Sequence, residues 1–159
     1  MLLRKRAWDI AREEFPVVRA DDSLAEAMRR LREFQARDAG CICALVLDKG
    51  DNFVGAISIW DTMRFMERHL LRGSALDGFD ESGFDRVFHN ACKVAGSTAV
   101  SKIMDRHVTV LRPDEPLPMV LEQVVQRGRS YAVVKEGPKV IGVVMITDLY
   151  REISGEITS

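Results

Sequence analysis

Two stretches of the chain end in an aspartate where an apolar run gives way to a helical pattern. They are Val54-Gly-Ala-Ile-Ser-Ile-Trp-Asp61 and Ile141-Gly-Val-Val-Met-Ile-Thr-Asp148. A strand that runs directly into a helix leaves backbone N–H groups free at the positive end of the helix dipole, where an anion can bind. Each aspartate is predicted to be the helix N-cap, and its carboxylate keeps the capacity to accept hydrogen bonds from a ligand.

These two stretches are parts of an internal repeat. The two aspartates are 87 residues apart, as are the two glycines, and the openings at 17–24 and 110–117 are 93 apart. The offset changes only in the loop between the first helix and the next strand, and loops tolerate changes of length. The chain therefore contains a duplicated unit of roughly fifty residues.

Each unit reads as strand, helix, strand, strand and helix. Alternating and helical periodicities give this order in both copies, with hairpin turns at 49–52 and 136–139. Residues 2–14 are predicted to form an amphipathic lead-in helix. The predicted domains are 1–72 (lead-in helix and first repeat), 73–99 (linker and helix) and 100–159 (second repeat).

The linker and the cysteines each allow two interpretations. Phe84, Val87, Phe88 and Ala91 fit an amphipathic helix that packs on its own chain or, less favoured, binds a partner. Cys41 and Cys43 are expected to be apolar core residues; a metal site with His89 and Cys92 is less favoured, because Cys-x-Cys is not the common zinc spacing. The prediction is no metal.

Composition and motifs exclude several classes of function. The net charge is −1, no apolar run approaches about 18 residues, and no signal core follows Met1–Arg6. We therefore expect a cytoplasmic protein that binds neither nucleic acid nor membrane. No Gly-x-Ser-x-Gly, P-loop, His-Glu-x-x-His or Gly-x-Gly-x-x-Gly motif is present, and the histidines lack an evident acid partner or nucleophile. The chain is predicted not to be an enzyme.

The repeated Gly-apolar-apolar-(Thr/Ser)-x-x-Asp ending, with this order of elements, resembles a tandem pair of CBS domains, a Bateman module. The resemblance covers residues 12–72 and 100–154. It implies an α/β (α+β) fold of two β-α-β-β-α repeats packed with pseudo-two-fold symmetry. One departure is that the Thr/Ser position holds Ser58 in the first repeat but Met145 in the second. The second site is therefore expected to be weaker, apolar-lined or empty.

The resemblance implies a non-catalytic regulatory module without a cofactor. It would bind an adenine nucleotide (AMP, ADP or ATP) in the cleft between the repeats, serve energy sensing, form a homodimer and signal to a protein target that the sequence does not identify. Two alternatives stay open: a module that binds S-adenosylmethionine, and a ligand-free dimerisation or interaction module.

The same resemblance implies the site residues. Those expected at the ribose and phosphates are Ser58, Asp61, Asp148, Arg129, Arg64 and Arg151. Those expected near adenine are Thr109, Val110 and Tyr131 for the ligand held by Asp61, and Val17, Val18 and Cys43 for the ligand at Asp148.

Overall fold

The computed structural model describes residues 4–72 and 81–159. The chain divides into two compact units. Unit 2 comprises Val17–Glu33 and Cys43–Arg106, and unit 1 comprises Met1–Pro16, Phe34–Ile42 and His107–Ser159. Each unit is described by itself.

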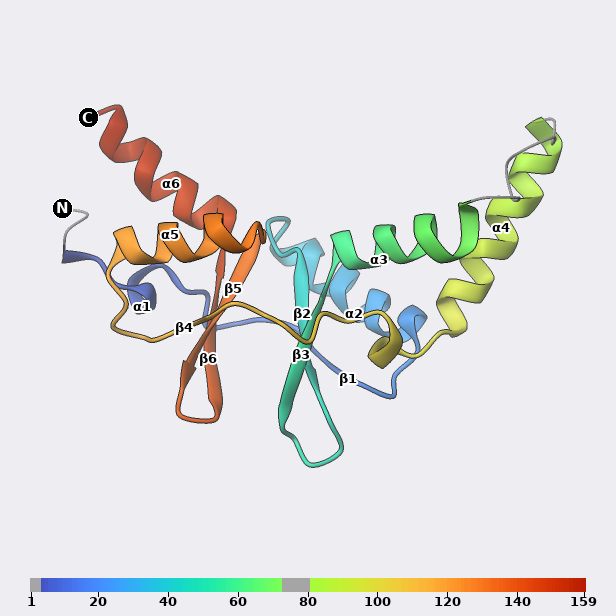
Figure 1. Ribbon diagram of the computed structural model, residues 1–159, viewed down its shortest axis with the longest axis horizontal. Coiled ribbons are helices and arrows are strands. Elements are labelled where there is room, and N and C mark those ends of the chain that lie inside the picture. The colour runs from blue at the N-terminus through green and yellow to red at the C-terminus, as the bar shows by residue number, and fades with distance from the viewer. Residues whose placement is uncertain (1–3, 73–80) are drawn as a thin grey trace. The chain divides into compact units, whose positions relative to one another are not determined.

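Unit 2 is built on a three-stranded sheet of β1 (Val17–Arg19), β2 (Cys43–Leu47) and β3 (Phe53–Ser58) (Figure 1). β1 runs parallel to β2, and β2 runs antiparallel to β3. The helical elements are α2 (Leu24–Arg37, whose last turn belongs to unit 1), α3 (Ile59–Phe65), the π-helix η2 (Met66–Leu71), α4 (Glu81–Ser97) and the 3₁₀-helix η3 (Val100–Lys102).

The core of unit 2 lies between this sheet and its helices. Its buried members are Val18, Leu24, Ala27, Ala44, Val46, Ile57, Ala95, Val100 and Ile103. The buried residues of α2 are Leu24, Ala27 and Leu31, so the helix presents one apolar stripe, as its period of about 3.6 residues predicts. The side chain of Ser23 caps α2 by accepting a hydrogen bond from the Glu26 N–H at 3.2 Å.

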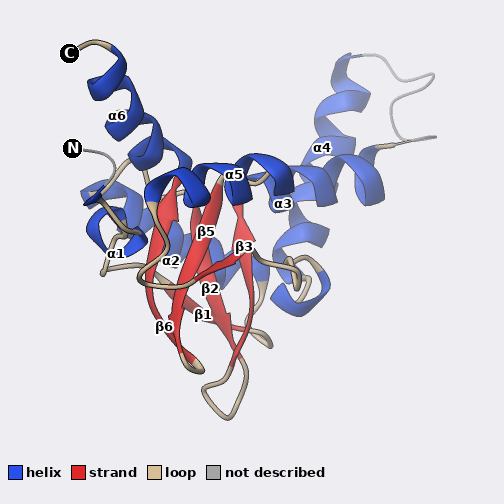
Figure 2. Ribbon diagram, turned by 60° about the vertical axis from the view of Figure 1, so that its left-hand side comes forward, coloured by secondary structure: helices blue, strands red, loops and turns tan. Residues whose placement is uncertain are grey.

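Unit 1 repeats this topology. β4 (Val110–Leu111) runs parallel to β5 (Tyr131–Glu136), and β5 runs antiparallel to β6 (Lys139–Met145). The helices are α1 (Ala7–Ile10), α5 (Leu117–Arg127) and α6 (Ile146–Ile157). Figure 2 shows the strands of both sheets in red. The described residues thus form two three-stranded sheets with flanking helices, which confirms the predicted fold class and both hairpins.

The lead-in segment of the chain packs on the sheet of unit 1. Ala7 and Ile10 of α1 are buried with residues of α5, β5 and β6. The predicted helix over 2–14 is too long, because α1 is a single turn and ends at Ile10; residues 1–3 lie outside the described residues. After that turn the backbone extends along β6, where it forms hydrogen bonds that a longer helix would not allow.

A backbone crossing explains the glycine of each repeated stretch. In unit 2, Asp105 and Ala56 exchange N–H···O bonds of 2.8 and 3.0 Å, and a Cβ on Gly55 would lie 2.4 Å from the Asp105 carbonyl oxygen. In unit 1, Arg12 and Val143 exchange bonds of 2.8 and 3.0 Å, and a Cβ on Gly142 would lie 2.9 Å from the Ala11 Cβ. Only glycine gives the crossing segment this room. Arg12 and Asp105 therefore hold corresponding places in the two repeats.

The helix predicted around Phe84–Ala91 is present as α4, but its exposure differs from the prediction. Ala91 is buried, whereas Phe84 and Phe88 are 38% and 53% exposed. The buried hydrophobic residues of α4 are therefore Ala91 and Ala95, whereas the two phenylalanines are largely exposed. The predicted linker also includes residues 73–80, which lie outside the described residues.

Candidate functional site

The first repeated stretch forms a capped strand–helix junction between β3 and α3. Ser58 is the N-cap of α3, and its Oγ accepts a hydrogen bond from the Asp61 N–H at 3.1 Å. Asp61 is the third helical residue, and its Oδ2 accepts from the Ser58 N–H at 2.9 Å and from Ser58 Oγ at 3.0 Å. The prediction that Asp61 is itself the N-cap is wrong, because the helix begins at Ile59. The pair forms a capping box.

This arrangement leaves part of the Asp61 carboxylate available. Oδ1 accepts no hydrogen bond from the described part of the chain. The pKa of Asp61 is raised, chiefly because burial disfavours the charged form; the negative charge of Asp105 adds to this, while the Ser58 hydrogen bonds and the charge of Arg64 oppose it. The Arg64 guanidinium lies over the Trp60 ring, 5.7 Å from its centroid.

The second junction, between β6 and α6, is built differently. Its N-cap is Met145, which makes no side-chain capping bond and is buried with 1% of its surface exposed. The Ile146 N–H at the helix start donates instead to the Ser130 carbonyl at 2.8 Å. As at the first junction, the aspartate is the third helical residue and not the predicted N-cap.

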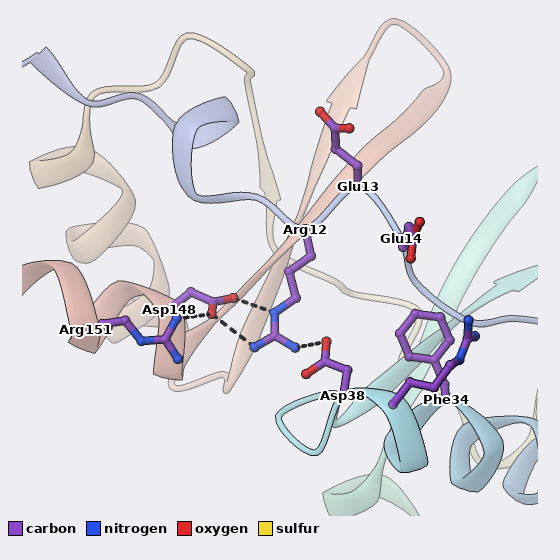
Figure 3. A pocket seen from close by; sticks show the side chains of 8 residues that line it. Arg12, Glu13, Glu14, Phe34, Asp38, Asp148 and Arg151 are labelled. Carbon is purple, nitrogen blue, oxygen red and sulfur yellow. Dashed lines mark hydrogen bonds and ion pairs between the residues drawn. The ribbon is translucent and has the colours of Figure 1, made fainter.

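The Asp148 carboxylate is held by an arginine from the other end of the chain (Figure 3). Arg12 Nε donates to Oδ2 at 2.8 Å and Nη2 to Oδ1 at 3.0 Å, while Nη1 donates to Asp38 Oδ2 at 2.5 Å. The hydrogen bond to Asp148 is the largest cause that raises the pKa of Arg12. Arg151 adds an ion pair with Asp148 at 3.6 Å, although its side chain is 76% exposed. The Arg12 and Asp148 side chains are only 18% and 11% exposed.

A cavity of about 650 Å³ opens beside this ion pair, a volume within the range of small-molecule sites. Its lining is mostly charged and comprises Arg12, Glu13, Glu14, Phe34, Arg37, Asp38, Asp148 and Arg151. Arg37 lies over the Phe34 ring at 5.0 Å. In unit 2, a cavity of about 10 Å³ lined by Ser58, Thr62 and apolar residues is too small for more than one water.

The residues expected near adenine differ in how much surface they offer. Val18 is fully buried in the core of unit 2 and therefore offers a ligand no surface, and Cys43 is 1% exposed. Val17 is half-buried.

In unit 1, the predicted adenine residues lie at the start of β4 and β5. Tyr131 is 4% exposed and pairs with Met145 across the sheet, while Val110 is 47% exposed. Thr109 is 3% exposed, and its Oγ1 forms no hydrogen bond with any described residue. A buried hydroxyl without a partner is unusual and is consistent with a ligand group that completes it.

The three arginines predicted to bind phosphate differ in their distance along the chain from the two aspartates. Arg64 and Arg151 lie one helical turn after their aspartates and interact with them electrostatically. Arg129 lies in the loop before β5, next to Ser130, whose carbonyl accepts from the start of α6. Arg12 and Asp105 were not among the residues predicted from the sequence. The offset of 93 residues, extended back from Val17 and Val110, would have aligned them.

The arrangement matches a known family. The CBS domain model matches residues 7–68 and 100–155. The chain therefore belongs to the CBS domain family and carries a pair of CBS repeats, a class of regulatory ligand-binding module. No catalytic family is indicated. A comparison with curated proteins found no match.

Solved structures share the fold at low sequence identity. An uncharacterised conserved protein from Pyrococcus horikoshii is 18% identical with a TM-score of 0.67; 96% of this chain and 95% of that chain are covered. The CBS-domain protein ATU1752 from Agrobacterium tumefaciens is 14% identical with a TM-score of 0.68, covering 94% and 93%. The CBS domain pair of protein MJ0100, in complex with 5′-methylthioadenosine and S-adenosyl-L-methionine, is 18% identical with a TM-score of 0.70, covering 96% and 98%.

Among residues 4–72 and 81–159, no helix combines the length and apolar character needed to cross a membrane. Within the same residues, no group of three or more His, Cys, Asp or Glu side chains is arranged to hold a metal ion. Cys41 and Cys43 are each 1% exposed, as expected of apolar packing residues.

Proposed function

We propose that this CBS pair is a non-catalytic regulatory module that binds an adenosyl ligand, in the first place AMP, ADP or ATP, at the Ser58–Asp61 junction. The observation that carries the proposal is the capping box, which fixes the Asp61 carboxylate through Oδ2 and leaves Oδ1 to accept hydrogen bonds. A ribose diol donates such bonds, and bonds to a charged acceptor are the strong ones.

The phosphates of the ligand would be bound by positively charged side chains near the start of α3. Arg64 is one turn after Asp61, and its charge acts on that carboxylate. Its stacking on Trp60 holds the guanidinium in place without using its hydrogen-bond donors. The positive end of the α3 dipole adds to the attraction for an anion.

One observation favours a second ligand, S-adenosylmethionine. Burial is the main cause of the raised pKa of Asp61, and the negative charge of Asp105 adds to it. A second carboxylate repels phosphates and attracts a sulfonium cation. The MJ0100 domain pair, whose fold is shared, was solved with S-adenosyl-L-methionine.

Regulation would follow from ligand occupancy. A ligand shifts a module between two arrangements only by its difference in affinity for them. The output would pass to a protein partner, and the cytoplasmic location, the homodimer and the energy-sensing role remain predictions.

A thermal melt with a ligand panel tests the proposal. Protein stripped of nucleotide by unfolding and refolding would be melted with AMP, ADP, ATP and S-adenosylmethionine. A ligand at 100 times its dissociation constant stabilises the native state by about 2.7 kcal/mol, which corresponds to a midpoint shift of roughly 5–10 °C at this size. Asp61→Ala, at the same ligand concentration, is expected to reduce the shift to about half or less. No shift with any of the four would reject the proposal in favour of the ligand-free interaction module.

A further inference from the structure

The side chain of Arg12 occupies the space in front of the Asp148 carboxylate. Its Nε and Nη2 donate to the two different carboxylate oxygens at 2.8 and 3.0 Å, so the guanidinium and the carboxylate face each other as a planar fork (Figure 3). The third arm of the fork, Nη1, is bound to Asp38. The guanidinium is thus tied to two carboxylates at once.

The backbone of Arg12 is fixed as well. Its N–H donates to the Val143 carbonyl at 2.8 Å, and its carbonyl accepts from the Val143 N–H at 3.0 Å. A Cβ on Gly40 would lie 2.8 Å from Arg12 Nη2, so the loop closes directly over the guanidinium. Arg12 is therefore preorganised by its backbone hydrogen bonds, its two ion pairs and the loop at Gly40. Because its side chain is already ordered, little further conformational entropy is lost when it stays bound to Asp148.

A ribose diol that donates to both oxygens of Asp148 would compete with the Arg12 guanidinium, which already donates to both. The carboxylate has lone pairs left over, but the two hydroxyls of a diol need the side of the carboxylate that the fork covers. A neutral diol would also have to replace charge-assisted hydrogen bonds with weaker ones. Displacement of Arg12 would then leave its charge without Asp148 in a largely buried place.

The corresponding place at the first junction holds Asp105, which cannot donate hydrogen bonds to Asp61 when ionised. Asp105 makes the equivalent backbone bridge, to Ala56. Its carboxylate raises the pKa of Asp61 instead of pairing with it. The two junctions therefore share the aspartate and the crossing segment, and they differ in the charge at one corresponding position.

We propose that Arg12 binds the Asp148 carboxylate in place of a ligand's ribose and thereby restricts adenosyl ligands to the Asp61 junction. Residues 12 and 105 are then the specificity-determining pair that decides which of the two repeats binds. This inference rests on the proposed function, because it assumes that a free aspartate at this junction binds a ribose.

Isothermal titration calorimetry of the full chain with AMP, and separately with S-adenosylmethionine, tests the inference. The wild type is expected to bind one ligand per chain. Arg12→Met removes the guanidinium but keeps an apolar stem, and is expected to bind two. Arg37→Met is the matched control: it removes a positive charge from the same cavity without a hydrogen bond to Asp148, and is expected to bind one.

Two further variants locate the sites and cover the case in which Arg12→Met folds poorly. Arg12→Met combined with Asp61→Ala is expected to bind one ligand, at Asp148. Asp105→Arg, which places a guanidinium at the corresponding position of the first junction, is expected to weaken ligand binding by the otherwise wild-type chain at least tenfold.

The outcomes separate the two proposals. Two ligands on the wild type, or one ligand on a folded Arg12→Met variant, would overturn the role of Arg12 while leaving the adenosyl-binding function intact. Ligand bound by Arg12→Met but not by the wild type would support the role of Arg12 and reject the Asp61 site. No binding by any variant would reject the proposed function and this inference with it.

Discussion

The two strand–helix junctions share one sequence pattern but place their aspartates in opposite chemical settings. At the first, Asp61 folds back onto its own helix start and forms a capping box with Ser58. At the second, Met145 offers no hydroxyl, and Asp148 binds Arg12, 136 residues away in sequence. The first carboxylate has another negative charge nearby, whereas the second is neutralised.

The two copies of the repeated motif therefore share their backbone geometry but differ in the chemistry around the aspartate. The glycine, the crossing segment and the helix start are present in both copies, because a larger side chain would collide with the crossing backbone. The side chain at positions 12 and 105 is not constrained by that crossing, so it can reverse the electrostatics of the site.

The largest effect on stability is expected for the crossing glycines. Gly55→Ala would place a Cβ 2.4 Å from a backbone oxygen, which cannot move alone, and is expected to cost about 3 kcal/mol. Gly142→Ala meets the Ala11 Cβ at 2.9 Å and the Arg12 carbonyl oxygen at 3.1 Å, and is expected to cost about 1–2 kcal/mol. Urea unfolding followed by circular dichroism measures both. A greater loss for Gly142→Ala would contradict this order.

Removal of the charge at the two corresponding positions should change stability in opposite directions. Arg12→Met leaves Asp148 without its bidentate partner and is expected to destabilise unit 1 by about 1.5–3 kcal/mol. Asp105→Asn relieves the repulsion at Asp61 and is expected to stabilise the protein by about 0.5 kcal/mol. Chemical denaturation at neutral pH, without ligand, gives both values, and changes of the same sign would refute the electrostatic contrast.

A smaller effect is expected for the helix cap. Ser58→Ala removes the N-cap of α3 and is expected to cost about 1 kcal/mol, whereas Ser58→Thr keeps a capping hydroxyl and should cost less. Differential scanning calorimetry resolves the two variants. Equal losses would show that the hydroxyl does not stabilise the helix.

Ionisation of Asp61 should act in opposite directions on stability and on binding. Because its pKa is raised, mainly by burial, the carboxyl contributes stability below the ordinary aspartate value of about 3.9 that is lost as the pH rises through the raised value. Ligand affinity should rise over the same range, because the ionised form accepts the diol. Denaturation midpoints of the wild type and Asp61→Asn across this range provide the test; a constant difference would contradict the shift.

The repeat made most of the fold predictable from the sequence. Two copies of one pattern, with hairpin turns at Lys49–Asn52 and Glu136–Lys139, gave the order of strands and helices. The helix starts were misplaced by three residues, because Ile59 and Ile146, which continue the apolar pattern of the strands, are already the first helical residues. The lead-in helix was too long, because amphipathic spacing does not reveal the backbone bonds between Arg12 and Val143.

The site was less predictable than the fold. Asp61, Ser58 and Arg64 lie within one short segment, so their proximity follows from helix geometry. The Arg12–Asp148–Asp38 cluster joins three distant segments, and no local pattern predicts such a contact. The resemblance placed Val18 near adenine, and its side chain lies in the core of unit 2; its role at a ligand stays a prediction.

The measurement that tests the account most directly is the ligand affinity of Asp61→Ala beside that of Asp148→Ala, by calorimetry with the ligand that gives the largest thermal shift. We expect Asp61→Ala to weaken binding by about 1.5–3 kcal/mol, roughly ten- to a hundredfold or more. In the wild type, Arg12 already binds the Asp148 carboxylate. Asp148→Ala should therefore change the ligand affinity by less than about threefold, under 1 kcal/mol. Equal losses in the two variants, or a larger loss for Asp148→Ala, would contradict the account.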